Sequence, residues 1–279
     1  MLTIQDTLTS SIAQLSSISD SAQLDCELIL SSILNKPRTY LHTWPEATLT
    51  NKELDKFNLL LKRRIKGEPI AHILGERGFW SLNLKVTADT LIPRPDTERL
   101  VELALEIIPE QAQWKILDLG TGTGAIALSL AKERLNCHII ATDQSIAALD
   151  IAKQNAAKNQ IKNIEFIQSD WFAELENQLF NLIVSNPPYI CDNDPHLKEG
   201  DVRFEPLSAL TAGTDGLDDI RSIIKDSHRH LIHGGVLLLE HGYDQAEAVS
   251  DLLKAANFSN VHNAKDYGGN PRVTIGYIK

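Results

Sequence analysis

The sequence has few cysteines, no long apolar run and no basic N-terminal segment, and each absence limits the class of protein. Its three cysteines, Cys26, Cys137 and Cys191, are scattered and form no C-x-x-C pair, which argues against a disulfide or zinc framework and for reduced thiols. No stretch approaches the roughly 18 apolar residues that span a bilayer. The first residues carry Asp6 and lack the basic residues of a secretory signal or a transit peptide. We therefore expect a cytoplasmic protein, without a membrane segment or a metal site.

An excess of positive charge is also lacking. The net charge is −10; residues 1–75 hold eight basic and eight acidic residues, so the whole excess lies in residues 76–279, with 19 basic and 29 acidic residues. Binding to a nucleic-acid backbone depends on clustered Lys and Arg, so this distribution argues against sequence-specific nucleic-acid binding. The short run KRRIK, 62–66, fits either a solvated helix face or a small partner-binding patch.

The chain is expected to contain two domains and a linker. Residues 1–75 show helical spacing, as at Leu24, Leu28 and Ile29, and Thr50 with Glu53 fits a capping box. We interpret 1–75 as a helical substrate-recognition domain, 76–95 as a hairpin linker and 96–279 as the catalytic domain.

Helical and strand patterns alternate in the third segment. This alternation predicts a Rossmann-like α/β fold with a mostly parallel, seven-stranded sheet covered on both faces. The expected helices are 96–108, 124–134, 145–159, 216–232 and 243–257, and the strands that can be placed are 114–119, 138–142, 164–168, 181–185, 235–240 and 272–278.

A glycine-rich segment, GTGTG, follows the first expected strand of this domain. Its residues are Gly120, Thr121, Gly122, Thr123 and Gly124. Glycines there let the backbone turn sharply and approach a ligand beside a helix N-terminus. The segment formally satisfies G-x-G-x-x-G/A, so a nicotinamide dehydrogenase is an alternative, whereas no Gly-Lys-Ser/Thr follows as in a P-loop.

The ends of the next two strands supply further candidate cofactor ligands. Asp143 can accept both ribose hydroxyls of an adenosine, or can act as the N-cap of the following helix. Asp170 can accept from an adenine amino group, and Trp171 can cover the adenine ring or pack in the core. These residues predict an adenosine-containing cofactor.

The strand 181–185 runs into Asn186, Pro187, Pro188 and Tyr189. Two prolines remove two N–H donors and hold the chain extended, so a rigid rim of acceptors remains, including the side-chain oxygen of Asn186. Such a rim suits a planar –NH2 group, and Tyr189 adds an aromatic face. An Asn-Pro dipeptide also marks ordinary turns. In an open α/β sheet, however, this turn and the glycine loop would face each other across one crevice.

The pair DLGTGTG and NPPY resembles class I S-adenosylmethionine-dependent methyltransferases that act on a planar nitrogen. With LIPRPDTE (91–98), VRFEP (202–206), EHG (240–242) and DYGGNPRV (266–273), the chain is similar over nearly its whole length to the HemK/PrmC-type peptide chain release factor glutamine N5-methyltransferases. Its "PDTE" has Asp96 where Glu is also common.

The resemblance implies a function and a set of site residues. Gly120 to Gly124, Asp143, Trp171 and Asn186 would contact S-adenosyl-L-methionine or lie beside it, and Asn186 to Tyr189 would hold the glutamine of the Gly-Gly-Gln loop of a bacterial-type release factor. We expect the Asn186 side-chain oxygen and the Pro187 carbonyl to accept the two amide N–H groups, and Tyr189 to fix the amide plane. No general base is evident near this motif, and we expect a monomer.

Other functions remain open at this point. A methyltransferase acting on a glutamine of a large-subunit ribosomal protein shares NPPY. An adenine-N6 nucleic-acid methyltransferase would use similar chemistry but should show a basic groove. A dehydrogenase leaves NPPY unexplained, and a non-catalytic cofactor-binding adaptor would not depend on Asn186.

Several polar residues have no assigned role in this scheme. His228, His230 and His233 are expected near a helix C-terminus capped by Gly234, and not at a metal. Arg203 and Glu205 fit a lid, a substrate contact or a surface ion pair, and Arg94 fits either the cofactor crevice or a brace of the linker.

Overall fold

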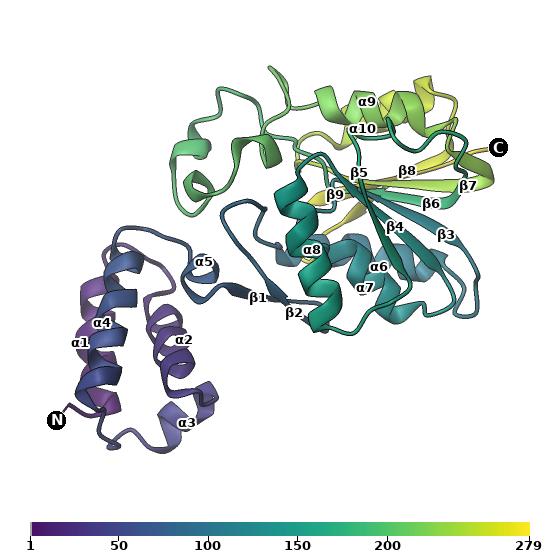
Figure 1. Ribbon diagram of the computed structural model, residues 1–279. Helices are drawn as coiled ribbons and strands as arrows, with labels where there is room; N and C mark the ends of the chain where they lie inside the picture. Colours follow the sequence, from purple (N-terminus) through teal and green to yellow (C-terminus); the bar gives the residue numbers. More distant parts are fainter. Residues whose placement is uncertain (1) are drawn as a thin grey trace. The chain divides into compact units, whose positions relative to one another are not determined.

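The computed structural model describes residues 2–279, and the chain divides into two compact units (Figure 1). Unit 1 comprises Met1–Gly75 together with Lys198–Phe204, and unit 2 comprises Glu76–Leu197 and Glu205–Lys279. A short segment that follows the NPPY strand in sequence therefore belongs to the helical unit. Among the described residues, no helix is both long and apolar enough to cross a membrane.

Unit 1 is built from helices around an apolar core that includes Ile29, Leu30 and Phe57, all fully buried. The predicted capping box is confirmed: the Thr50 hydroxyl accepts from the Glu53 N–H while the Glu53 carboxylate accepts from the Thr50 N–H. The helices are α1 (Ile4–Leu15), α2 (Ala22–Leu34), α3 (Arg38–Thr43), α4 (Asn51–Ile65) and α5 (Ile70–Leu74).

The two arginines of the basic run at the end of α4 are paired within unit 1. Arg64 donates to Asp25 at 2.7 Å and to Asp201 at 3.0 Å, and Arg63 pairs with Glu68. The Arg64 side chain is only 11% exposed. Arg64 is therefore a structural residue that joins α2, α4 and the segment Lys198–Phe204, and not part of a solvated face.

Unit 2 contains one seven-stranded sheet of order β5-β4-β3-β6-β7-β9-β8. The first five strands are parallel, and β9 runs antiparallel to both of its neighbours. This arrangement confirms the predicted class I fold. The strands are β3 (Lys115–Leu119), β4 (His138–Asp143), β5 (Ile164–Gln168), β6 (Phe180–Ser185), β7 (Leu231–Glu240), β8 (Ser259–Lys265) and β9 (Pro271–Tyr277).

Helices cover both faces of this sheet (Figure 1). Successive residues of a strand point to opposite faces, so Ile116 packs in one apolar cluster with α6 and α7, while Leu117 packs in the other with α9 and α10. The ranges are α6 (Glu98–Ile107), α7 (Ala125–Glu133), α8 (Ile146–Lys158), α9 (Asp218–Ser227) and α10 (Ala246–Ala255). Strands buried on both faces explain the continuous apolar runs.

Two details differ from the prediction. The helix expected over 216–232 ends at Ser227, and the following strand already begins at Leu231. His233 and Gly234 therefore lie in β7, where the pairing with β6 is irregular, and Gly234 caps no helix. Strand β8 could not be placed from sequence because this edge strand is polar and its burial alternates only weakly.

A two-stranded hairpin, β1 (Glu76–Phe79) and β2 (Leu82–Lys85), opens unit 2. Its inward residues Leu82 and Leu84 belong to the cluster beneath the sheet. The fully buried Asn155 of α8 exchanges two hydrogen bonds with the backbone of Lys85 and donates a third to the Thr123 carbonyl. The hairpin is thereby tied to α8 and to the glycine loop.

Candidate active site

The glycine loop and the NPPY turn follow neighbouring strands. β3 and β6 pair in parallel, with Leu119 opposite Ser185, and the Ser185 hydroxyl donates to the Leu119 carbonyl at 2.8 Å. β4 lies on the other side of β3, so the chain order reverses between β3 and β6. Ligands of open α/β sheets bind at such a switch point. The prediction that the two loops share one crevice is therefore confirmed.

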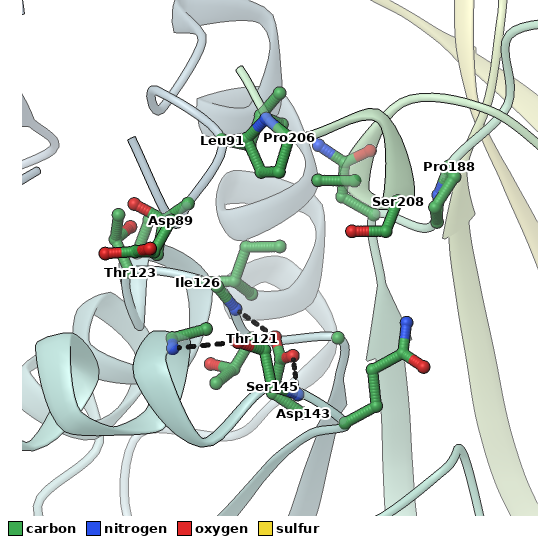
Figure 2. Close-up of a pocket in the computed structure, with 18 of the residues that line it drawn as sticks. Asp89, Leu91, Thr121, Thr123, Ile126, Asp143, Ser145, Pro188, Pro206 and Ser208 are labelled. Atoms are coloured by element: carbon green, nitrogen blue, oxygen red, sulfur yellow. Dashed lines mark hydrogen bonds between the residues drawn. The ribbon is translucent and has the colours of Figure 1, made fainter. Parts of the chain in front are cut away.

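A cavity of about 640 Å³ lies at this position, within unit 2. Figure 2 shows Asp143 and Ser145 on one wall and Leu91, Pro206, Ser208 and Pro188 on the opposite side. Most of the predicted site residues line it: Gly120, Thr121, Gly122, Thr123, Asp143, Asp170, Trp171, Asn186 and Pro188. Gly124, Pro187 and Tyr189 are not among the lining residues, so the structure does not bring the predicted substrate contacts of Pro187 and Tyr189 to the cavity wall.

Buried polar groups hold the glycine loop in shape. Asp118, fully buried at the end of β3, accepts from the Thr121 hydroxyl at 2.6 Å and from the Ala127 N–H at 3.2 Å. Burial raises the pKa of Asp118 to about 7, against the lowering effect of these bonds. Gly124 has a φ of +83°, and a Cβ there would lie 2.9 Å from a Leu128 methyl carbon. A side chain at 124 would therefore push the loop away from α7.

Asp143 connects the glycine loop to α8. One carboxylate oxygen accepts from the Gly122 N–H at 2.9 Å and the other from the Ser145 N–H at 2.9 Å. Burial raises the pKa of Asp143, opposed by these two backbone hydrogen bonds. The N-cap of α8 is Ser145, so the alternative that Asp143 caps this helix is wrong. Asp143 keeps the remaining lone pairs of its two oxygens for a ligand.

Trp171 has a backbone conformation that is rare for a bulky residue. Its φ is +46°, and such strain is concentrated at functional sites. The indole ring lies 3.5 Å from the position of a Gly120 Cβ, packs against the core beside α9, and donates to Asp219. Trp171 therefore packs against the core and also lines the cavity, and its stacking on an adenine ring stays a prediction. Asp170 is exposed at the rim.

Asn186 is held by two residues that sequence reasoning missed. Its side-chain nitrogen donates to the Thr97 hydroxyl at 3.1 Å, and that hydroxyl donates to a Glu240 carboxylate oxygen at 3.2 Å. Thr97 and Glu240 are 4% and 1% exposed. The motifs PDTE and EHG contained them, but nothing in either motif indicated that a hydrogen-bond chain would end at Asn186.

The turn at Tyr189 is braced from the other side. Gln245 donates to the Tyr189 carbonyl at 3.0 Å and accepts from the Gly242 N–H at 2.9 Å. Gly216 has a φ of +71°, and a Cβ there would lie 2.3 Å from the same carbonyl oxygen. Burial and the neighbouring Glu240 raise the pKa of the Tyr189 phenol well above its ordinary value. Tyr189 therefore stays neutral.

Glu205 fastens the loop above the cavity. Its buried carboxylate accepts from the Ile92 N–H at 3.0 Å and pairs with Arg94, which lines the cavity. Arg203 donates to the Lys66 carbonyl within unit 1, whereas the buried Glu205 pairs with Arg94. The Glu205 anchor keeps Pro206, Ser208 and Ala209 at the cavity wall.

The charge of the cavity indicates the kind of cofactor it accepts. Four carboxylates line it, from Asp89, Asp143, Asp170 and Asp219, and Arg94 is already paired with Glu205. A pyrophosphate would be repelled, which disfavours a nicotinamide dinucleotide. A cofactor with a cationic sulfonium and an adenosine fits the acidic wall, the carboxylate of Asp143 and the indole of Trp171. Within residues 2–279, no three His, Cys, Asp or Glu side chains gather as metal ligands.

The fold and the cavity together define a class I S-adenosylmethionine-dependent methyltransferase. Residues 99–199 match the Methyltransferase small domain and residues 6–75 match the PrmC N-terminal domain. The release factor glutamine methyltransferase of Escherichia coli (strain K12) is 52% identical over 272 residues, covering 98% of each chain. That of Vibrio cholerae serotype O1 is 51% identical over 280 residues, covering 100% of this chain and 98% of its own. The chain belongs to the release factor glutamine methyltransferase family.

Solved structures agree with the fold. A methyltransferase from Pyrococcus furiosus superposes with a TM-score of 0.54 at 17% identity, over 77% of this chain and 96% of its own. A 16S rRNA N2 G1207 methyltransferase of T. thermophilus, solved with AdoMet and guanosine, gives 0.54 at 19% identity, over 73% and 50%. At this identity the likeness concerns the fold alone.

The buried Glu240 predicts a pH-dependent stability. Burial raises its pKa from 4.5 to about 7, against the opposing effects of Thr97 and Arg272. The pKa of Glu240 is higher in the folded protein than in the unfolded one. The contribution of Glu240 to stability is therefore complete below pH 4.5 and is lost as the pH rises through 7. We expect wild type to lose on the order of 3 kcal/mol of unfolding free energy relative to Glu240→Gln across this range. Urea unfolding of both proteins at several pH values measures it; parallel pH profiles would contradict it.

Proposed function

We propose that this enzyme transfers a methyl group from S-adenosyl-L-methionine to the side-chain amide nitrogen (N5) of the glutamine in the Gly-Gly-Gln motif of bacterial-type peptide chain release factors, in support of translation termination. The observation that carries the proposal is the orientation of Asn186. Its amide nitrogen is occupied by Thr97, so its oxygen is left for the cavity that it lines. The curated relatives named above support the choice of substrate.

The reaction requires acceptors and no strong base at the nitrogen. The cofactor supplies an electrophilic methyl group on a sulfonium sulfur. The Asn186 oxygen accepts one N–H group of the substrate amide at the cavity wall. The carbonyl of Pro187, the next residue of the turn, is the proposed acceptor for the other N–H once substrate is bound, and the two acceptors aim the nitrogen lone pair away from themselves. As the N–CH3 bond forms and the S–CH3 bond breaks, positive charge develops on the nitrogen. The two acceptors would stabilise that charge until one N–H proton passes to bulk water.

The adenine-N6 alternative is disfavoured by charge. The cavity wall carries four carboxylates and a single, paired guanidinium. A nucleic-acid substrate would bring phosphates toward this wall. A protein substrate with a neutral glutamine side chain meets no such repulsion. The glutamine of a ribosomal protein remains the second candidate, because the four residues of the turn would serve it equally.

The expected setting follows from the substrate. Release factors act in the cytoplasm, so we place the enzyme there, as a monomer with unit 1 recognising the protein substrate. Cys26 fits a reducing compartment: burial and the neighbouring Asp25 and Glu27 raise its pKa to about 11, so the thiol stays protonated and unreactive.

Incubation with methyl-labelled S-adenosyl-L-methionine and purified release factor tests the proposal. We expect label on the wild-type factor and none on a factor whose loop glutamine is replaced. Equal labelling of both factors, or labelling of neither, would overturn it. Label on a ribosomal protein or on DNA in a parallel reaction would select the corresponding alternative.

A further inference from the structure

We propose that Thr97 is a positioning residue that fixes the Asn186 amide with its oxygen, and not its nitrogen, toward the substrate. The inference rests on the proposed amide methylation and assigns a role to a residue outside the NPPY turn. Thr97 precedes α6, 89 residues before Asn186 in the chain. It belongs to the PDTE segment, which has no assigned role in the proposed methyl transfer.

The hydrogen-bond chain has a defined direction. An ionised carboxylate has only acceptors, so the single proton of the Thr97 hydroxyl must point to Glu240. The Thr97 oxygen is then left as an acceptor. Of the two ends of the Asn186 amide, only the nitrogen can donate to it, at the observed 3.1 Å. The buried Glu240 thus determines, through one hydroxyl, which end of Asn186 faces the cavity.

Asparagine needs such a constraint because the two ends of its amide have almost the same size and shape. A reversed Asn186 would present its N–H donors to the substrate N–H that its oxygen otherwise accepts. Neither donor would then have an acceptor there, which costs the desolvation of each group. The site would still be filled, but it would reject the amide nitrogen. The rigid prolines position the backbone of the turn, and they do not decide this rotation.

The charged and polar groups around Glu240 come from several elements. Thr97 and Asp96 precede α6, Tyr189 follows β6, and Arg272 lies in β9. Arg272 favours the ionised carboxylate, and Asp96 and burial oppose it. The assay is therefore run at about pH 8, above the pKa of about 7, where Glu240 is mainly ionised.

Three threonine variants test the inference on labelled release factor. Thr97→Val removes the hydroxyl at nearly constant volume, and we expect kcat/KM to fall about tenfold, the equivalent of one lost orienting hydrogen bond. Thr97→Ser keeps the hydroxyl and should stay within about twofold of wild type, the scatter expected of a change without lost hydrogen bonds. Thr274→Val is the matched control, because that buried hydroxyl also has two hydrogen-bond partners, His241 and Asn263, and lies away from the cavity.

The cofactor Kd separates orientation from general damage. We expect it to be unchanged in Thr97→Val, with a similar loss of thermal stability in Thr97→Val and Thr274→Val. Wild-type kcat/KM in Thr97→Val, or an equal loss in Thr97→Ser, would overturn the inference. If Thr97→Val does not fold, Glu240→Leu decides. Leucine removes the acceptor of the Thr97 proton, so the hydroxyl can donate to Asn186 and the reversed amide is permitted; full activity there would be equally contrary. Failure of wild type to label the factor would instead overturn the proposed function.

Discussion

Replacing Asn186 with alanine is expected to lower kcat for release factor methylation by about 10²–10³-fold, the loss seen when one preorganised charge-stabilising group is removed. The variant keeps the two prolines and loses the side-chain oxygen that accepts from the reacting amide. The cofactor Kd should change far less, because Asp143 and the glycine loop remain in place. Single-turnover labelling and a cofactor titration measure the two quantities.

Asn181→Ala is the matched control for this variant. Asn181 lies on the same strand, β6, and its side-chain oxygen accepts from the Lys115 N–H at 2.9 Å, outside the cavity. It should lose some stability and no activity. If Asn186→Ala kept more than about a tenth of the wild-type kcat, the acceptor role of the side chain would be wrong.

Replacing Asp143 with alanine is expected to raise the Kd for S-adenosyl-L-methionine by at least about 100-fold, since hydrogen bonds to a charged group are each worth about 1.5–3 kcal/mol. The change removes the two carboxylate oxygens that we propose as acceptors for the ribose. It also releases the Gly122 N–H, which the carboxylate holds at 2.9 Å, so the glycine loop loses its shape. Isothermal titration with the cofactor measures the effect.

Asp150→Ala removes the same charge from the neighbouring helix. Asp150 is exposed and makes only a long contact of 3.9 Å with Lys153. Its cofactor affinity should equal that of wild type. A similar loss in both variants would mean that the net charge of unit 2, and not the Asp143 contacts, governs cofactor binding.

Sequence patterns sufficed for most of the sheet and for the location of the site. Apolar runs ending in glycines or in Asn-Pro placed β3, β6 and both loops, because a strand buried on two faces consists mainly of apolar residues. The glycine-glycine pair at 234–235 was a misleading signal. It lies at a pairing irregularity in β7, because burial of the apolar residues that follow favours strand structure for the whole segment.

The supports of the site were beyond sequence reasoning for a physical reason. Asn186 lies 89 positions after Thr97 and 54 positions before Glu240, and each motif alone permits many partners. Glu205 and Arg94 met the same difficulty, being 111 positions apart. Hydrogen bonds between distant segments depend on the register of the sheet and on where each loop leaves it. Periodicity carries no such information.

The segment Lys198–Phe204 has a practical consequence for dissecting the protein. It belongs to unit 1, where Asp201 pairs with the nearly buried Arg64 and Arg203 donates to the Lys66 carbonyl. The polypeptide therefore passes from one unit to the other three times, and no single cleavage of the chain yields a complete unit 1 or unit 2. A truncation at Gly75 would leave the guanidinium of Arg64 without one of its two carboxylate partners, that of Asp201. A recombinant fragment or fusion that contains unit 1 should therefore include residues 198–204, joined to residues 1–75 by a linker.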